Sequence, residues 1–336
     1  MVRVGILGAT GYTALELMKL LLRHPEAEIT LLTSRQEGEP HVGAVHPQLA
    51  GRLDLTLQNL ESSMVAARCD CVFSCLPHAA SAEIVKPLVD GGTRVVDFSA
   101  DYRLDDADTY AQWYGHTHPD PRRVGTTVYG LPEWFGDAIP SAKLVANPGC
   151  YPTSAILALA PLMKAGLIDA ADVIVDSKSG VSGAGRTPKL TTHFPECNES
   201  LSAYNVGGHR HTPEIDQILR RATGKSPTVV FTPHLIPMDR GILTTAYARP
   251  AADVSEDQLF DALQAAYRGK PFVRVVQHLP ATKDVAYSNF CDITVRLVRG
   301  RVILVSCLDN LIKGAAGAAV QNFNLMFGFP ETTALL

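Results

Sequence analysis

The chain has 336 residues, more than one ordinary hydrophobic core covers, so two domains are expected. Hydrophobic residues make up 46% and charged residues 19%, a balance typical of globular proteins and not of disordered ones. The formal charge is −4 and no block of Lys or Arg occurs, which argues against a nucleic-acid partner.

The cellular compartment is expected to be the cytoplasm. Residues 1–8 lack the hydrophobic stretch and cleavage site of a signal peptide, and no run approaches the ~20 apolar residues of a membrane span. The seven cysteines, an odd number, indicate reduced thiols rather than disulfides. We therefore expect no membrane partner.

The first 145 residues alternate between strand-like and helix-like segments. Strands are predicted at residues 2–7, 28–32, 71–76, 94–98 and 143–146, with helices at 14–23 and 80–90. Such alternation favours a Rossmann-type parallel sheet with helices on both faces.

The second half has a different pattern. Strands are predicted around residues 173–175, 228–232 and 242–247, and two longer ones at 290–298 and 301–307 meet at Arg299-Gly300 as a hairpin. This favours a second α+β domain with a mixed or antiparallel sheet. A last helix, residues 312–326, is expected to dock back on the first domain.

A glycine-rich turn joins the first strand to the first helix: Gly5, Gly8 and Gly11 form G-x-x-G-x-x-G, a variant of the dinucleotide-binding spacing. Backbone N–H groups in such a turn can approach a pyrophosphate at the positive end of the helix. A plain tight turn is the alternative, but the preceding strand and following helix favour a nucleotide site.

The end of the second strand bears on which nucleotide binds. An NAD site would place Asp or Glu there, whereas this chain has Thr33-Ser34-Arg35. A hydroxyl and a guanidinium can hold the 2′-phosphate of NADP. The interpretation as a solvated loop stays open, because Glu37 follows closely.

Cys150 is the candidate nucleophile. The segment Asn147-Pro-Gly-Cys150-Tyr-Pro-Thr153 follows a strand and leads into a helix over 154–165, with Pro152 in its first turn. A helix start favours a thiolate and lowers the pKa of a cysteine from about 8.5 toward neutrality. By contrast, Cys69, Cys71 and Cys75 fit the pattern of small buried residues, and no zinc set or other metal site is predicted.

Two histidines could transfer the proton. His209 and His211 flank Arg210 in a glycine-flanked stretch. If this stretch is extended, both rings point the same way; if it opens a helix at Thr212-Pro213, one ring is turned aside. The sequence alone leaves open which histidine acts.

Arginines in two loops could hold an anionic substrate. Arg103 follows the carboxyl end of a predicted parallel strand, where ligands of open sheets collect. Arg186 ends the loop Ser179-Gly-Val-Ser-Gly-Ala-Gly-Arg186, whose small residues allow a ligand or another backbone to approach closely. A surface position is the alternative for each.

Several segments together resemble the N-acetyl-gamma-glutamyl-phosphate reductases, the arginine-pathway branch of the aspartate-semialdehyde dehydrogenase group. They occur in the order that the family has and span nearly the whole chain: Gly8-Ala-Thr-Gly-Tyr12, Asp97-Phe-Ser-Ala-Asp-Tyr-Arg103, Val128-Tyr-Gly-Leu-Pro-Glu133, Asn147-Pro-Gly-Cys-Tyr-Pro-Thr153, Ser179-Gly-Val-Ser-Gly-Ala-Gly185, His209-Arg-His-Thr-Pro-Glu214 and Asn310-Leu-Ile-Lys-Gly-Ala-Ala-Gly317 with Gln321-Asn322.

The resemblance implies an NADPH-dependent reductase of a small acyl phosphate, acting through a thioester on Cys150. It implies an NADP-binding domain of residues 1–147 with 312–336, a catalytic and oligomerisation domain of residues 148–311, and a dimer or tetramer. The residues expected to bind the cofactor are Gly8, Ala9, Thr10, Gly11, Tyr12, Ser34, Arg35, Pro77, His78, Gly183 and Asn322. Those expected to bind substrate are Arg103, Asn147, Arg186 and Arg210.

Two alternatives stay open. The same chemistry could act on aminoadipyl phosphate or aspartyl phosphate, since a pocket discriminates one methylene by only about 1–3 kcal/mol. A nucleotide-sensing regulator without activity is a more distant possibility, and the presence of the cysteine, both histidines and the arginines argues against it.

Overall fold

The protein is described by a computed structural model that covers residues 1–35, 37–251 and 253–336. The chain forms two compact units, the first of residues 1–148 with 315–336 and the second of residues 149–314. These limits lie within three residues of the expected domain boundaries. No helix built from the described residues is long and apolar enough to cross a membrane.

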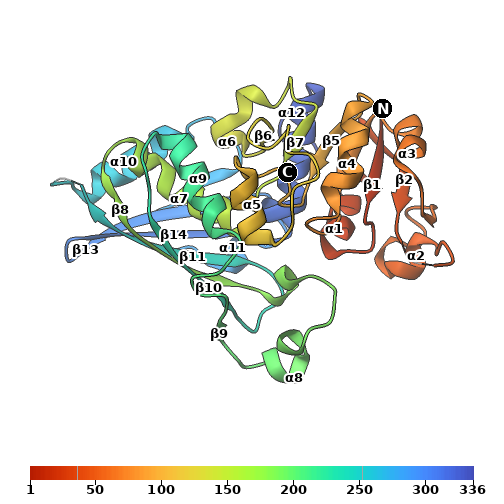
Figure 1. Ribbon diagram of the computed structural model, residues 1–336. Helices are drawn as coiled ribbons and strands as arrows, with labels where there is room; N and C mark the ends of the chain where they lie inside the picture. The colour runs from red at the N-terminus through yellow and green to blue at the C-terminus, as the bar shows by residue number, and fades with distance from the viewer. Residues whose placement is uncertain (36, 252) are drawn as a thin grey trace. The chain divides into compact units, whose positions relative to one another are not determined.

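The first unit is built on a seven-stranded sheet in the order β3-β2-β1-β4-β5-β7-β6. Strands β1, β2, β5, β6 and β7 are labelled in Figure 1. Each neighbouring pair is parallel, as predicted. The order reverses between β1 and β4, which is the switch point where open α/β sheets bind ligands. The strands are β1 (Val2–Leu7), β2 (Ala27–Thr33), β3 (Leu57–Gln58), β4 (Cys71–Ser74), β5 (Arg94–Asp97), β6 (Val128–Tyr129) and β7 (Leu144–Ala146).

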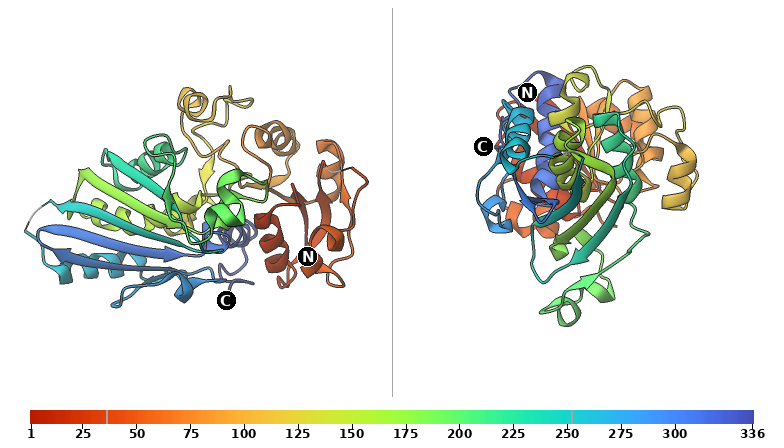
Figure 2. Two further views of the ribbon diagram at one scale, coloured as in Figure 1. Left: turned by 90° about the horizontal axis from the view of Figure 1, so that it is seen from below. Right: turned by 90° about the vertical axis from the view of Figure 1, so that its left-hand side faces the viewer.

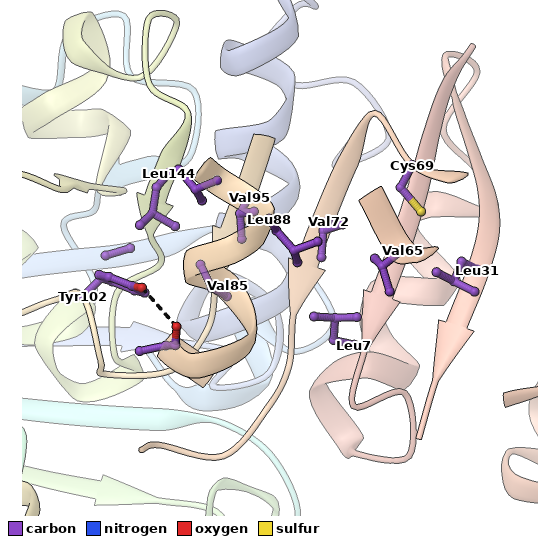
Figure 3. Close-up of a cluster of buried hydrophobic side chains, with 13 residues drawn as sticks. Leu7, Leu31, Val65, Cys69, Val72, Val85, Leu88, Val95, Tyr102 and Leu144 are labelled. Atoms are coloured by element: carbon purple, nitrogen blue, oxygen red, sulfur yellow. Dashed lines mark hydrogen bonds between the residues drawn. The ribbon is translucent and has the colours of Figure 1, made fainter. Parts of the chain in front are cut away.

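Helices cover both faces of this sheet. Leu7, Val72 and Val95 join side chains of α3 (Ser62–Arg68) and α4 (Ser81–Asp90) in one buried apolar cluster (Figure 3). Phe73 points to the opposite face, where its ring lies 5.7 Å from that of Phe323 in α12. The remaining helices are α1 (Tyr12–Leu21), α2 (Val42–Val45), α5 (Ala107–Tyr114), α6 (Pro132–Phe135) and α12 (Gly317–Phe327).

The second unit holds a mixed sheet in the order β12-β13-β14-β11-β8-β10-β9. Parallel pairs join β8 to β10 and β12 to β13, and the other pairs are antiparallel. The strands are β8 (Ile168–Ser179), β9 (Ser202–Ala203), β10 (Val229–Leu235), β11 (Ile242–Pro250), β12 (Val273–Val275), β13 (Cys291–Val298) and β14 (Arg301–Leu308). The predicted α+β class of this part is confirmed.

The helices α7 (Cys150–Lys164), α9 (Thr212–Thr223) and α10 (Glu256–Tyr267) lie along one face of this sheet (Figure 1). Every residue of α7 from 151 to 163 is buried, so this helix forms the centre of the unit. Short helices α8 (Phe194–Cys197) and α11 (Thr282–Val285) complete it, and the segment around α8 stands away from the sheet (Figure 2).

The opposite face of the second sheet carries an apolar stripe. Val230, Ile174, Tyr247 and Ile303 are paired in register across four neighbouring strands. Val230, Ile174 and Tyr247 are 58%, 42% and 38% exposed, so side chains that fit a buried sheet position face outward here.

Two local predictions have clear outcomes. The β13–β14 hairpin is confirmed: Val298 pairs with Arg301, and Arg299 and Gly300 have φ of 48° and 76°, as a type I′ turn requires. The last helix does return to the first unit, where α12 packs against α1 and β5, but it opens with a π-helical turn over Ile312–Ala316 instead of a regular helix.

Candidate active site

The glycine turn lies at the carboxyl end of β1. Gly8 has φ of 71°, and a Cβ there would come within 2.8 Å of the carbonyl oxygen of Cys75, so only glycine fits. The next residue is held from two sides, because the N–H of Ala9 donates to the carbonyl of Thr33 at 2.9 Å and Nε2 of buried His46 donates to the carbonyl of Ala9 at 2.8 Å.

The start of α1 is suited to an anion. Gly11 is its N-cap residue and offers no side-chain cap, and the first turn contains no acidic residue. A Cβ on Gly11 would meet no atom within 4 Å. Thr10 and Tyr12 flank this open space, so a phosphate could reach the N–H groups at the positive end of the helix.

The end of β2 continues into the segment predicted to read the 2′-phosphate. The N–H of Ser34 donates to the carbonyl of Gln58 at 3.0 Å, which fixes the backbone at this point. Arg35 and Glu37 are both exposed, so the preference for NADP at this strand end stays a prediction.

The loop after β4 holds Pro77 and His78. The N–H of Ala100 donates to Nδ1 of His78 at 2.9 Å, so a neutral ring carries its proton on Nε2. The same ring lies edge-on to Tyr114, with 5.4 Å between centroids. His78 is therefore oriented at the switch point, and its contact with the cofactor stays a prediction.

Arg103 is buried and bonded to backbone carbonyls. Its Nε donates to the carbonyl of Asn147 at 2.8 Å, and a terminal nitrogen donates to that of Phe98 at 2.7 Å. In this arrangement the guanidinium supports the turn that leads to Cys150. A role of Arg103 in binding substrate stays a prediction.

Asn147 and Asn322 form a buried amide pair. The side-chain nitrogen of Asn322 donates to the carbonyl of Gly130 at 2.9 Å and to Oδ1 of Asn147 at 3.1 Å. That of Asn147 donates to the carbonyl of Ala315 at 3.0 Å. Among the described residues, Oδ1 of Asn322 has no hydrogen-bond partner, although it is buried.

Cys150 is the first residue of α7, four residues earlier than the predicted start. Gly149 caps the helix, and its N–H donates at 2.9 Å to Oε1 of Glu214, a fully buried carboxylate on α9. The backbone around the sulfur is crowded, since a Cβ on Gly314 would lie 2.8 Å from Cβ of Cys150. The position of Cys150 is thus fixed by a helix about 65 residues later in the chain and by the π-helical turn.

Two of the three cysteines predicted as small core residues are buried; the prediction was wrong for Cys75, which is only partly buried because it follows the last residue of β4, Ser74. Cys69 and Cys71 are buried, and burial raises the pKa of both thiols. Cys150 is only partly buried. Exposure separates Cys150 from the buried thiols of Cys69 and Cys71, and its position at a helix start separates it from the partly buried Cys75.

His209 and His211 lie together beside Tyr151, the residue that follows Cys150. Their ring centroids are 4.8 Å apart, and both rings lie edge-on to Tyr151 at 5.6 and 5.9 Å. A helix does open at Thr212, yet neither ring is turned aside, so that part of the prediction was wrong. The physical reason is the N–H of His211, which donates to Nδ1 of His209 at 3.1 Å and folds the two rings onto one side.

The proton of His209 can be placed from its surroundings. Burial, aided by the charge of Arg210, lowers the pKa of His209 to about 4, so this ring is neutral at neutral pH. Because its Nδ1 accepts from the backbone, the neutral ring carries its proton on Nε2 and is a hydrogen-bond donor. Tyr204 lies edge-on to the same ring and donates to the hydroxyl of Tyr151 at 3.0 Å.

The loop of small residues packs against another loop, as its composition allowed. The N–H groups of Val181 and Ser182 donate to the carbonyls of Met238 and Asp239 at 2.8 and 3.1 Å. Asn310 joins the two loops, since its side chain accepts from the N–H of Gly241 at 2.7 Å and donates to Ser182 at 3.0 Å. Gly183, Arg186 and Arg210 are exposed, so their ligand contacts stay predictions.

Sequence reasoning missed several residues that shape these sites. Glu214 and Gly314 fall inside motifs that the sequence had singled out, but neither had a role, because their partners lie far away in the chain. Tyr204 could have been suspected from its closeness to the histidine pair. No sequence signal marks His46, whose bond to Ala9 spans 37 residues.

Comparison with known proteins places the chain among the semialdehyde dehydrogenases. The family described as semialdehyde dehydrogenase, NAD binding domain, matches residues 3–142, and that described as semialdehyde dehydrogenase, dimerisation domain, matches residues 150–310. A solved structure of aspartate semialdehyde dehydrogenase II from Vibrio cholerae has a TM-score of 0.74 at 18% identity, covering 98% of each chain, which shows a shared fold.

Curated relatives are more similar. The N-acetyl-gamma-glutamyl-phosphate reductase of Rhodopirellula baltica is 56% identical over 99% of this chain and 98% of its own length. That of Geotalea daltonii is 51% identical over 100% of this chain and 98% of its own. The chain therefore belongs to the N-acetyl-gamma-glutamyl-phosphate reductase family.

Proposed function

We propose that the chain reduces N-acetyl-L-glutamyl 5-phosphate to N-acetyl-L-glutamate 5-semialdehyde and phosphate with NADPH, as a step of arginine biosynthesis in the cytoplasm. The observation that carries this proposal is Cys150 at the first position of a 15-residue helix, followed by Tyr151, whose ring contacts a histidine pair. The chain is also about half identical to reductases of that name. The small-molecule substrate is the acyl phosphate.

The first unit fits a dinucleotide by two independent observations. The uncapped start of α1 with open space at Gly11 suits the diphosphate, which Gly8, Ala9, Thr10, Gly11 and Tyr12 would hold. The buried Oδ1 of Asn322 suits a carboxamide donor of the nicotinamide. Ser34 and Arg35 would hold the 2′-phosphate, and Pro77, His78 and Gly183 complete the proposed cofactor contacts.

In the acylation step the sulfur of Cys150 attacks the acyl carbon, the bond to the phosphate oxygen breaks, and inorganic phosphate leaves with the bonding electron pair. The start of α7 favours the thiolate over the thiol, and the arginines Arg103, Arg186 and Arg210 are proposed to act on the anionic substrate together with Asn147. The product of this step is a thioester on Cys150.

When bound, NADPH would supply the hydride that reduces the thioester carbonyl carbon. We propose that His209, a neutral donor through Nε2, hydrogen-bonds the developing oxyanion. His211 is proposed to give a proton to this oxygen and to take it back when the carbon–sulfur bond breaks. When the carbon–sulfur bond breaks, the semialdehyde leaves and the sulfur returns to the thiolate held at the helix start.

The test is an assay of NADP reduction that depends on phosphate and N-acetylglutamate semialdehyde, with aspartate and aminoadipate semialdehydes as competitors. Cys150→Ala should abolish turnover, while Cys197→Ala, another partly buried cysteine, should retain it. Faster turnover of one of these competitors would identify that semialdehyde, instead of N-acetylglutamate semialdehyde, as the substrate. Turnover by the Cys150→Ala variant would refute the thioester mechanism.

We also propose a homo-oligomer in which the apolar stripe of Val230, Ile174, Tyr247 and Ile303 meets a second copy of the chain. The stripe lies within the segment that matches the dimerisation domain family. Charged pairs border it, among them Asp172 with Arg249 at 3.1 Å and with Arg301 at 2.7 Å, as the polar rim of an interface does.

A further inference from the structure

The first unit contains two helix starts beside the switch point, and only one of them is available to an anion. α1 begins at the uncapped Gly11. The start of α4, after β4, is occupied by a side chain from elsewhere: the carboxylate of Asp101, which is 1% exposed. The sequence gives no sign of this cap, because Asp101 lies 20 residues after the start of α4.

The carboxylate of Asp101 accepts three hydrogen bonds. Its Oδ1 accepts from the N–H of Ala79 at 2.8 Å and from the hydroxyl of Tyr110 at 2.8 Å, and its Oδ2 accepts from the N–H of Ala82 at 2.9 Å. The carboxylate therefore ties the loop of residues 77–80 to the first turn of α4. Its negative charge is favourable at this end of a ten-residue helix.

The loop that Asp101 holds is in an unfavourable conformation. Ala79 has φ of 69°, in the left-handed region that a residue with a Cβ rarely adopts, so its conformation depends on surrounding contacts. The segment that carries Asp101 makes two more such contacts: Ala100 donates to His78, and the hydroxyl of Tyr102 reaches the carbonyl of Ala82 at 3.4 Å (Figure 3).

Residues 75 and 76, which lead directly into this loop, border the glycine turn. The carbonyl of Cys75 and the side chain of Leu76 are the atoms that a Cβ on Gly8 would meet, at 2.8 and 3.3 Å. The 77–80 loop is therefore joined to residues that line the glycine turn. A loop free to move would leave His78 without a fixed orientation.

We propose that Asp101 is a positioning residue for the dinucleotide, a role that rests on the proposed NADPH-dependent function. By accepting from Ala79 and Ala82, it fixes the 77–80 loop in its strained shape and orients His78. By occupying the start of α4, it also leaves the start of α1 as the site for the cofactor's diphosphate. Asp101 itself touches neither substrate nor cofactor in this proposal.

The test compares Asp101→Asn with Asp106→Asn. Asp106 is a matched control, because it caps α5 by accepting from the N–H of Thr109 at 2.7 Å but does not hold the 77–80 loop. An asparagine at 101 has a single acceptor oxygen, and its NH₂ group faces an N–H donor, so one of the two backbone bonds is lost. If the loop is then ordered in about a tenth of the molecules, the Kd for NADPH rises about tenfold.

Three measurements decide the outcome: NADPH binding by fluorescence titration, hydrogen exchange of the peptide that spans residues 77–82, and alkylation of Cys150 by iodoacetamide without nucleotide. Asp101→Asn should raise the Kd about tenfold, accelerate exchange in that peptide and leave alkylation unchanged, whereas Asp106→Asn should leave all three near wild type. Faster exchange with an unchanged Kd, or an equal rise of the Kd in both variants, would overturn the proposal.

Tyr110→Phe is a milder variant should Asp101→Asn fail to fold. It removes one donor from Oδ1 and leaves both backbone bonds, so a two- to threefold rise in the Kd with slightly faster exchange is expected. An unchanged Kd despite faster exchange would again contradict the role of Asp101. If the wild-type protein bound no NADPH, the proposed function would fail instead, which separates the two results.

Discussion

Replacing Gly314 by alanine tests the packing around the nucleophile. The new methyl group would lie 2.8 Å from Cβ and 3.3 Å from Cα of Cys150. Ordinary contact starts at 3.4 Å, so one of the two backbones must move by about 0.6 Å. Because neither contacting atom is the end of a flexible side chain, the start of α7 has to give way.

The expected cost has two parts. Overpacking of this kind destabilises by about 1–3 kcal/mol, although alanine would stabilise an unconstrained helical position by up to ~1 kcal/mol. Since a nucleophile misplaced by 1 Å can cost about 10²-fold in rate, a shift of roughly half that size should lower kcat/KM about tenfold. Stability is measured by urea unfolding and kcat/KM by the phosphate-dependent assay.

The matched control is Gly136→Ala. Gly136 has ordinary helical dihedral angles, and a Cβ there meets no atom within 4 Å, so both stability and activity should stay near wild type. Wild-type activity and stability in Gly314→Ala would refute the crowding of Cys150. An equal loss in both variants would show that the effect is not specific to the nucleophile.

Four further outcomes are expected. Arg35→Ala should raise the KM for NADPH but not for NADH, and an unchanged preference would contradict the assignment of the 2′-phosphate. Asn322→Ala should weaken NADPH binding about tenfold, as loss of one buried hydrogen bond does, with titration as the measurement. Ile174→Lys should yield a smaller species in sedimentation velocity, whereas an unchanged mass would exclude the stripe from the interface. The folded-state pKa of His209, about 4, lies below its unfolded value near 6.5, so its contribution to stability is present above pH 6.5 and is lost as pH falls toward 4. In urea unfolding, His209→Asn should therefore lose less stability than wild type between pH 7 and pH 5.

The elements that could be predicted from the sequence carry apolar runs or clear local signals. Strands β1, β2, β4, β5 and β7 and the β13–β14 hairpin are examples, and the hairpin is marked by Arg299-Gly300. The two-residue strands β3 and β6 and the four-residue helix α2 left no periodic pattern to detect, and the longer helix α10 was missed as well. The existence of the short elements depends on partners distant in the chain.

In the candidate site, too, residues marked by local sequence signals could be predicted, and contacts between distant residues could not. Cys150 was recognisable because its neighbours, Gly149 and Pro152, are local signals of a helix start. The bond from Gly149 to Glu214 and the contact of Gly314 with Cys150 join residues 65 and 164 positions apart, which no local pattern encodes. The burial of Arg103 against backbone carbonyls was hidden for the same reason.

The central claim is that an acyl group is carried on Cys150. The most direct test is mass spectrometry of the protein after incubation with N-acetylglutamyl phosphate in the absence of NADPH. The account predicts an N-acetylglutamyl adduct on the peptide containing Cys150, which disappears when NADPH is added and never forms in Cys150→Ala. An adduct on another cysteine, or turnover without any adduct, would contradict it.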